Sequence, residues 1–303
     1  MVSRILVTGS GGLIGRALCR ALLAAGHDVV PFDLCEGQDV RNEDMLAEAM
    51  PRCSGIVHLA AVSRVAWCER DSYWCKAVNV EGTRTVARLA RESSMWPWLL
   101  FASSREVYGH VTSLPVGEDA PLRPVNVYGR AKVEGETVIG DARHAGVRTA
   151  IVRLSNVYGD IRDHADRVVP AFARAAVEGG VLKVEGTDSG FDFVHLYDAV
   201  RGLMFVVRAL ASGEKGLPPV HLVTGVMTKL RRLADLAIEL AGTNARVKRK
   251  MPRTYDVSWF QGDPRRSRSV LGWEAQVPLR NGLAQLIRDF RTMGVINIAE
   301  ATA

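Results

Sequence analysis

Tyr128 and Lys132 are four residues apart in the segment YGRAK, at the start of a predicted helix. On a helix, residues at positions i and i+4 project from one face, so the two side chains would lie side by side. A tyrosine has an ordinary pKa of about 10, which is too high for a base at neutral pH. A neighbouring ammonium group stabilises the phenolate and lowers that pKa toward the working range. The pair therefore predicts a tyrosine base that is tuned by Lys132, provided that the chain also binds a cofactor for it to serve.

A glycine turn, TGSGGLIG at residues 8–15, indicates where a cofactor would bind. Gly9, Gly12 and Gly15 are three residues apart. Without a Cβ atom, the chain turns sharply and its backbone N–H groups can meet a pyrophosphate at the N-terminus of a helix. Such a turn also occurs in proteins without a ligand. This one follows a predicted strand and opens a predicted helix, which is the context of a dinucleotide-binding turn.

Asp33 ends the second predicted strand, about 20 residues after the glycine turn. A carboxylate there can accept hydrogen bonds from both ribose hydroxyls of an adenosine, and it would repel a 2′-phosphate, so NAD is favoured over NADP. Arg41 is the only nearby cation that could favour NADP. It follows Asp39 and Val40, which could instead flank an adenine. The alternative for Asp33 is an ordinary turn residue at the end of a strand.

Apolar stretches alternate with helical stretches along the first half of the chain. The predicted strands are residues 4–8, 28–33, 55–61, 98–104 and 148–155, and the predicted helices are residues 13–25, 43–50, 69–93 and 126–145. Strands that are apolar along their whole length and alternate with helices belong in a parallel sheet covered on both faces. The predicted fold class is therefore α/β, a doubly wound parallel sheet of the Rossmann-like kind.

The alternation becomes less regular after residue 160, where glycines interrupt the sequence and helices are predicted near 228–241 and 279–291. We expect a smaller, interleaved C-terminal region that caps the carboxyl edge of the sheet, where such folds bind ligands. The predicted division is a dinucleotide-binding domain over residues 1–160, to which residues 191–212 return, and a mainly substrate-binding domain over residues 161–303.

Composition excludes several classes of protein. The 303 residues are 48% apolar and 24% charged, without a long biased run. Apolar runs end well before the ~18 residues of a membrane span and the N-terminus lacks a signal peptide, so we expect a cytoplasmic protein without membrane contact. The net charge of +6 comes from scattered arginines, without helix-turn-helix or zinc-finger spacing. A phosphate-bearing metabolite fits this pattern better than nucleic acid does.

The cysteines are odd in number and include no C-x-x-C pair. They are Cys19, Cys35, Cys53, Cys68 and Cys75. This pattern argues against both a disulfide framework and a zinc site, so we expect reduced, mostly structural thiols and no bound metal.

Eight motifs together resemble the extended short-chain dehydrogenase/reductase family, in particular its nucleotide-sugar epimerases and dehydratases. They are TGSGGLIG, HLAA at 58–61, NVEGT at 79–83, SSREVYG at 103–109, YGRAK at 128–132, RLSNVYG at 153–159, FDFVHLYDAV at 191–200 and GDPRRSRSVLGWE at 262–274. They occur in that family's order and extend over nearly the whole chain. The resemblance implies NAD as the cofactor and a nucleotide-diphosphate sugar as the substrate.

The resemblance also implies roles for the residues that match these motifs. The cofactor-binding residues would be Gly9, Gly12, Leu13, Ile14, Gly15, Asp33, Asp39, Val40, Leu59, Ala60, Ala61, Asn79, Ser103, Tyr128 and Lys132. The catalytic residues would be Tyr128, Lys132, Ser104 and Glu106, and the substrate-binding residues Ser104, Arg105, Asn156 and Arg253. Ser104 would hydrogen-bond the reacting sugar oxygen, whereas Asn156 and Arg253 would touch the phosphates.

The two residues after Ser104 depart from part of the family. Sugar 4,6-dehydratases carry Asp-Glu there, whereas this chain has Arg105 and Glu106. Because an arginine cannot act as the proton donor, dehydration is disfavoured. Glu106 resembles the glutamate of decarboxylating relatives and of some epimerases. It could contact the sugar, transfer a proton or be a solvated loop carboxylate.

Phe191 is a second departure, because the family usually has a phosphate-binding arginine at this place. Either Arg253, together with Arg265 or Arg266, supplies the missing charge, or the substrate differs from an ordinary UDP-sugar.

The first hypothesis for the function is an NAD-dependent nucleotide-sugar 4-epimerase that oxidises sugar C4 transiently to a 4-keto intermediate. A 4,6-dehydratase, a 4-keto reductase and a decarboxylase share the oxidation step and stay open as alternatives. A non-catalytic dinucleotide sensor is the alternative from another class. The helices at 69–93 and 126–145 match those that form a four-helix bundle in dimeric relatives, which implies a homodimer. The nucleotide and the sugar are not determined by the sequence.

Overall fold

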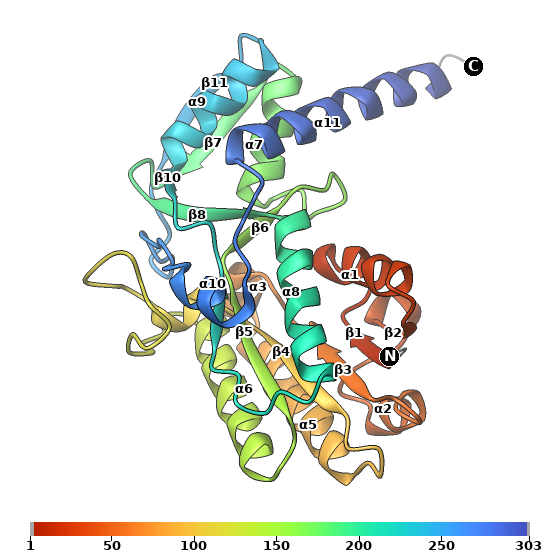
Figure 1. Cartoon of the computed structure of the whole chain (residues 1–303). Helices are drawn as coiled ribbons and strands as arrows, with labels where there is room; N and C mark the ends of the chain where they lie inside the picture. The colour runs from red at the N-terminus through yellow and green to blue at the C-terminus, as the bar shows by residue number, and fades with distance from the viewer. Residues whose placement is uncertain (1–2, 302–303) are drawn as a thin grey trace.

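The computed structural model describes residues 3–301. Its centre is a parallel sheet of six strands (Figure 1). In spatial order the strands are β2 (Asp28–Phe32), β1 (Arg4–Thr8), β3 (Gly55–His58), β4 (Trp98–Ser104), β5 (Thr149–Leu154) and β9 (Val220–Leu222). All neighbouring pairs are parallel. The predicted doubly wound α/β fold is confirmed.

Helices cover both faces of this sheet, because successive side chains of a strand point to opposite faces. One face packs against α1 (Leu13–Ala24) and α8 (Leu196–Ala211), and the other against α2 (Glu43–Ala49), α5 (Gly82–Glu92) and α6 (Val127–His144). In β1, for example, Ile5 and Val7 belong to the first core and Leu6 to the second, and all three are fully buried. This double burial explains why the strands are apolar throughout.

The second half of the chain builds a smaller region with its own core. It contains a three-stranded sheet in the order β10 (Met227–Lys229), β8 (Gly190–His195) and β6 (Asn156–Tyr158), and a two-stranded sheet of β7 (Val181–Glu185) and β11 (Arg246–Lys250). The helices packed there are α7 (Val168–Val177), α9 (Leu230–Ala241) and α11 (Leu279–Ala301), and the short α10 (Arg265–Leu271) lies nearer the large sheet. The chain returns from β8 through α8 to the large sheet, so the two regions are interleaved. The exact domain division stays a prediction.

The predicted helix at 69–93 is wrong as a single element. It consists of α3 (Val65–Arg70), α4 (Ser72–Lys76), one turn of π-helix (Ala77–Glu81) and α5. Asp71 separates α3 from α4, and its carboxylate accepts a hydrogen bond from the N–H of Trp74, which caps α4. The side chain of an aspartate competes for backbone donors in this way, and it therefore ends one helix and starts the next.

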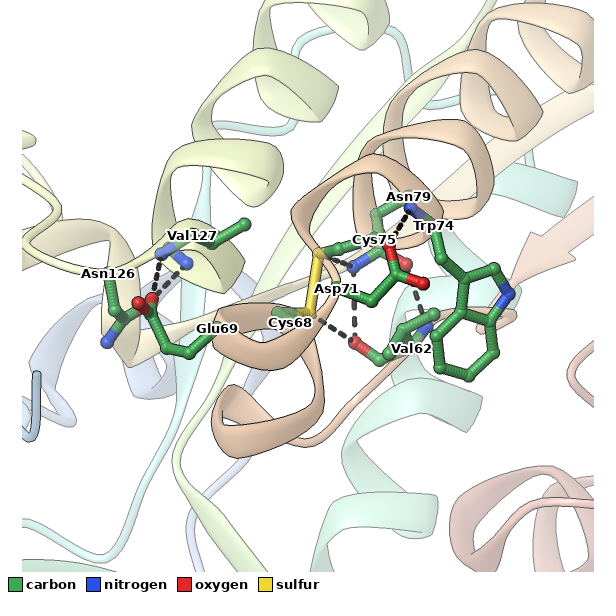
Figure 2. Close-up of a disulfide and its surroundings, with 10 residues drawn as sticks. Val62, Cys68, Glu69, Asp71, Trp74, Cys75, Asn79, Asn126 and Val127 are labelled. Carbon is green, nitrogen blue, oxygen red and sulfur yellow. Dashed lines mark hydrogen bonds between the residues drawn. A yellow bond between two sulfur atoms is a disulfide. The ribbon is translucent and has the colours of Figure 1, made fainter.

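The prediction that the cysteines are reduced thiols is wrong for two of them, which the break at Asp71 brings together. Cys68 on α3 and Cys75 on α4 form a disulfide (Figure 2). Their Cα atoms are 5.0 Å apart, within the range that a disulfide spans. A spacing of seven residues is not a recognised cysteine motif, and only the turn between two short helices brings the sulfurs together. Cys19, Cys35 and Cys53 are free thiols.

Two short 3-10 turns complete the elements, at Leu34–Glu36 after β2 and at Arg105–Tyr108 after β4. No helix within residues 3–301 is long and apolar enough to cross a membrane. The described part of the chain also contains no group of His, Cys, Asp and Glu side chains placed to hold a metal ion.

Candidate active site

A cavity of about 880 Å³ lies at the carboxyl edge of the large sheet and extends into the smaller region. All predicted site residues except Asn79 line it, including the glycine turn, Asp33, Ser104, Tyr128, Lys132 and Arg253. This edge is where ligands bind in doubly wound folds, because the strand ends and the helix N-termini meet there.

The glycine turn forms a cradle that larger residues would fill. Gly9 has a φ of +75°, and a Cβ atom there would lie 2.6 Å from the backbone nitrogen of Ala60. A Cβ atom on Gly15 would collide with the carbonyl oxygen of Gly9. Gly12 is the N-cap of α1, so the free N–H groups of that helix start at the turn. The turn therefore fits a pyrophosphate that approaches the backbone closely.

Asp33 is oriented by backbone donors beside this cradle. Its carboxylate accepts hydrogen bonds from the N–H of Gly11 at 2.8 Å and from the N–H of Cys35 at 2.9 Å. Burial by itself would raise the pKa of Asp33, but these hydrogen bonds and the nearby Arg16 outweigh it and lower the pKa. Asp33 is therefore a fixed anion next to the glycine turn, which fits ribose hydroxyls and disfavours a 2′-phosphate.

Arg41, the cation that could have favoured NADP, is bound to Asp39. Its Nε donates to both carboxylate oxygens of Asp39, at 3.0 and 2.9 Å. Asp39 and Val40 line the cavity, whereas Arg41 does not. The guanidinium is therefore engaged outside the cavity wall, and the site keeps its preference for a dinucleotide without the extra phosphate.

Asn79 lies behind the cavity wall rather than in it. It is 1% exposed, and its side-chain amide binds both backbone groups of Val62, accepting from the N–H at 2.7 Å and donating to the carbonyl at 3.2 Å (Figure 2). Val62 does line the cavity. The sequence predicts that Asn79 contacts the cofactor directly. In the structure, Asn79 instead lies behind the cavity wall and holds the loop after β3 in position.

Tyr128 and Lys132 lie on one face of α6, as their spacing predicts. Lys132 is 3% exposed, and its Nζ lies 5.8 Å from the ring centroid of Tyr128. The ammonium donates a hydrogen bond to the carbonyl of Ala102 on β4 at 2.8 Å. Burial lowers the pKa of Lys132 to about 8. The catalytic helix is thereby tied to the strand that carries Ser104.

The charge that acts most strongly on Tyr128 comes from another part of the chain. Burial raises the pKa of Tyr128 to about 12, and the largest opposing influence is the Arg167 guanidinium. A hydrogen bond with the Ser104 hydroxyl and the charge of Arg105 lower the pKa further, whereas Glu106 raises it. Lys132 is not among these leading groups. Arg167 is therefore the leading cation acting on Tyr128 in this structure, and the role of Lys132 as the tuning cation stays a prediction.

The N-terminus of α6 is held by two side chains that sequence reasoning missed. Asn126 caps the helix by accepting a hydrogen bond from the N–H of Gly129 at 2.7 Å. Glu69 on α3 accepts a hydrogen bond from the N–H of Val127 at 2.7 Å (Figure 2). Glu69 directly follows the disulfide-bonded Cys68. The position of Tyr128 therefore depends on α3, which the disulfide joins to α4.

Ser103 and Ser104 point to different partners at the end of β4. The Ser104 hydroxyl accepts a hydrogen bond from the N–H of Glu106 at 3.2 Å and faces Tyr128. The Ser103 hydroxyl lies 2.5 Å from a carboxylate oxygen of Glu136, which is ion-paired with Arg153 in the interior. Ser104 is therefore the serine available to a reacting group, as the alternation of side chains along a strand predicts.

Glu106 is not a solvated loop carboxylate, because it is 6% exposed and fully engaged. One of its oxygens is ion-paired with Arg105 at 2.8 Å, and the other accepts a hydrogen bond from the side-chain amide of Asn126 at 2.8 Å. Arg105 also donates from Nε to the side-chain oxygen of Asn156 at 3.0 Å. At the other end of the cavity, Arg253 is bound to Glu185 at 2.8 Å.

A polar cluster on the wall of the cavity was not predicted. Arg167 donates a hydrogen bond to Ser63 at 3.1 Å and lies 3.3 Å from Asp163, and Arg64 pairs with Asp166 at 2.7 Å. These five residues line the cavity. They come from two loops about a hundred residues apart, and neither loop carries a motif that would have identified them.

The chain is similar to a known family of proteins over most of its length. The model of the NAD dependent epimerase/dehydratase family matches residues 5–220. A UDP-glucose 4-epimerase from Mycolicibacterium smegmatis is 31% identical over 95% of this chain and 98% of its own length.

Two solved structures have folds that are similar to the fold of this chain. The UDP-glucose 4-epimerase from Thermotoga maritima, solved with UDP-glucose, has a TM-score of 0.89 and 26% identity over 96% of this chain and 99% of that one. MoeE5 in complex with UDP-glucose and NAD has a TM-score of 0.88 at 26% identity, over 96% of this chain and 99% of that one. Decarboxylases and dehydratases are also among the relatives. Together with the glycine cradle and the Tyr128–Lys132 helix, the match over most of the chain establishes that this protein belongs to the NAD dependent epimerase/dehydratase family, with NAD as its cofactor.

Proposed function

We propose that the protein is an NAD-dependent nucleotide-sugar 4-epimerase that works by transient oxidation at sugar C4. The observation that carries this proposal is the convergence of Ser104, Tyr128 and Lys132 on one wall of the cavity that also contains the glycine turn. A base, an orienting hydroxyl and a dinucleotide cradle in one cavity are the parts that reversible oxidation of an alcohol needs.

NAD fits the residues of the first half of the cavity. The glycine turn would hold the pyrophosphate, and Asp33 would hold the adenosine ribose. When bound, NAD supplies an acceptor that takes a hydride from sugar C4 and returns it, so no cofactor is consumed.

Tyr128 would remove the proton from the 4-hydroxyl of the sugar and give it back to the 4-keto oxygen after the sugar has turned over in the cavity. Ser104 would orient that oxygen, since its hydroxyl faces Tyr128. Because burial raises the pKa of Tyr128 to about 12, the base needs nearby positive charge, and Arg167 is placed to supply it. Lys132 would hold α6 against β4 through its hydrogen bond to the carbonyl of Ala102.

Dehydration is less well supported than epimerisation, because the two described residues that follow Ser104, Arg105 and Glu106, do not offer a free acid. Arg105 cannot release a proton at neutral pH. Glu106 has both oxygens engaged, by Arg105 and by Asn126. A 4-keto intermediate formed here would therefore meet no obvious group that eliminates water, and return of the hydride to the other face is the simplest completion.

The test uses UDP-sugars first, because UDP-glucose is bound in the structures of the Thermotoga maritima epimerase and of MoeE5. A panel of UDP- and dTDP-hexoses deuterated at C4, together with UDP-glucuronate, would be incubated with the purified protein, and the products analysed by NMR. Epimerisation predicts a C4 epimer that retains the deuterium at C4. Deuterium that moves to C6 would indicate dehydration, and release of carbon dioxide from a uronic acid would indicate decarboxylation. Either result would refute the proposal.

We also propose that the protein forms a homodimer through α5 and α6, as implied by the resemblance of these helices to those of dimeric relatives. Light scattering of the purified protein tests this, and a monomer at micromolar concentration would contradict it. A cytoplasmic location stays a prediction.

A further inference from the structure

Arg105 has a guanidinium group that the described chain satisfies only in part. The residue is 9% exposed and lines the cavity. Its Nε donates to Asn156 at 3.0 Å and its Nη2 is paired with Glu106 at 2.8 Å. Its Nη1 is shielded from solvent and finds no hydrogen-bond partner among the described residues. A buried donor without an acceptor is unfavourable, so this nitrogen is a place where an acceptor on a ligand would bind.

Phe191 holds the guanidinium in this position. The Arg105 Cζ atom lies 4.4 Å from the centroid of the Phe191 ring, and the Phe260 ring is 5.9 Å away. A guanidinium placed over an aromatic ring is attracted by the ring, and its N–H groups stay free to bind oxygen atoms. Phe191 is the residue that stands in place of the usual phosphate-binding arginine. A guanidinium is thus present next to position 191, supplied by the end of β4 instead of by β8.

The neighbouring acidic side chains do not bind Nη1 of Arg105. Glu106 uses one oxygen for Nη2 of Arg105 and the other for Asn126, so it cannot also accept from Nη1. The Asp256 carboxylate also lies near Glu106, and one of its oxygens is 3.9 Å from Nε of Arg253. Among the described residues, no acceptor lies within hydrogen-bonding distance of Nη1.

We propose that Arg105 binds an anionic oxygen of the nucleotide sugar through Nη1, and so supplies the cation that Phe191 does not. The inference rests on the proposed function in that the substrate is a nucleotide sugar. Two sources of the anion share this chemistry: the phosphate next to the sugar, and a carboxylate on a hexuronic acid. Both present an anionic oxygen that can accept a charge-assisted hydrogen bond from Nη1.

The experiment measures binding of UDP, UDP-glucose and UDP-glucuronate by calorimetry in a Tyr128→Phe background, which prevents turnover. Arg105→Gln should raise the dissociation constant about 10- to 100-fold, as loss of a charge-assisted contact predicts. A loss for all three ligands assigns the anion as the phosphate, and a loss confined to UDP-glucuronate assigns it as the sugar carboxylate. Unchanged binding of all three overturns the inference.

Two further variants separate recognition from folding. Arg105→Gln leaves Glu106 buried without its cation, so the double variant Arg105→Gln with Glu106→Gln removes both charges and should show the same loss of binding. Arg105→Gln with Phe191→Arg returns a guanidinium from β8 and should recover at least part of the affinity if the anion is the phosphate. The matched control is Arg162→Gln, whose exposed side chain is paired with Asp160 outside the cavity and should not change binding.

Failure of this inference can be distinguished from failure of the proposed function. If the parent protein binds none of the three ligands, the substrate is not a UDP-sugar, and the failure lies in the substrate assignment and not in the role of Arg105. If the parent protein binds them and Arg105→Gln binds them equally well, with bound NAD and thermal unfolding unchanged, only the role of Arg105 is refuted.

Discussion

Replacing Arg167 by glutamine should shift the pH dependence of the chemical step to higher pH. Arg167 precedes α7, in the smaller region, and its side chain reaches the cavity wall, where it binds Ser63 and Asp163. It is the strongest influence that opposes the raised pKa of Tyr128. Removing its charge should therefore raise the pKa of Tyr128 further and leave a smaller fraction of phenolate at any given pH.

The expected shift is about one pKa unit. A charge near a buried group typically changes its pKa by ~1 to 3 units. The side chain of Arg167 is 25% exposed and lies 3.3 Å from Asp163, so solvent and a partner anion both reduce its effect. This places the shift at the low end, at ~1 unit or about 1.4 kcal/mol. Since each unit changes the phenolate fraction about tenfold, the rate at neutral pH should fall about tenfold.

The assay is the single-turnover reduction of bound NAD by the sugar, followed by absorbance over a range of pH. In Arg167→Gln, the rising limb of the profile should move to higher pH while the limiting rate at high pH stays close to that of the parent. NMR titration of protein labelled with ¹³C at the tyrosine Cζ measures the same shift without any turnover. Arg162→Gln removes an exposed arginine of the same loop that is bound to Asp160, and it should leave both measurements unchanged.

Two results would refute this reasoning. A loss of rate that is the same at every pH would mean that Arg167 positions the substrate and does not tune Tyr128. An unchanged Tyr128 titration in Arg167→Gln would mean that the charge does not reach the phenol at all.

Three further perturbations test other parts of the structure. Tyr128→Phe should lower turnover by ~10² to 10⁴ while bound NAD is retained, whereas the control Tyr73→Phe, at an 86% exposed position, should be fully active. Cys68→Ser removes the disulfide to Cys75 and should lower the free energy of unfolding by ~2–3 kcal/mol; chemical denaturation without reductant measures this, and an unchanged midpoint would contradict it. Burial lowers the pKa of Lys132 to about 8, below the ~10.4 of an unfolded chain, so the unfolded state binds more protons between these values and stability should rise with pH there. Lys132→Met should abolish that rise and increase the free energy of unfolding at neutral pH by ~1–3 kcal/mol with loss of activity; a decrease at neutral pH would show that the hydrogen bond to β4 outweighs the cost of burial.

Much of the cofactor half of the site could be predicted from the sequence, because its geometry is local. The glycine turn is a contiguous segment between a strand and a helix, and Asp33 follows at the end of the next strand. Likewise, Tyr128 and Lys132 are one helical turn apart, so the period of the helix places them on one face. These relative positions are set by the geometry of single elements and of adjacent parallel strands. They therefore do not depend on how the rest of the chain packs.

The substrate half depends on contacts between distant segments, and the sequence contains little signal for these. Arg167 reaches the cavity from a loop that only the tertiary structure brings to the site of Tyr128 and Ser104. The sequence indicates only that the usual phosphate-binding arginine is missing at position 191. The structure shows the Arg105 guanidinium over the Phe191 ring, with Cζ 4.4 Å from the ring centroid.

The loop after β3 and the helices that follow show the same limit. Asn79 matches a motif, yet the turn of π-helix places its amide behind the wall, on the backbone of Val62. The Cys68–Cys75 disulfide exists because Asp71 ends one short helix and caps the next. In short, spacing along a single helix or strand is set by its own geometry, whereas side-chain partners that are remote in sequence are chosen by how the completed elements pack.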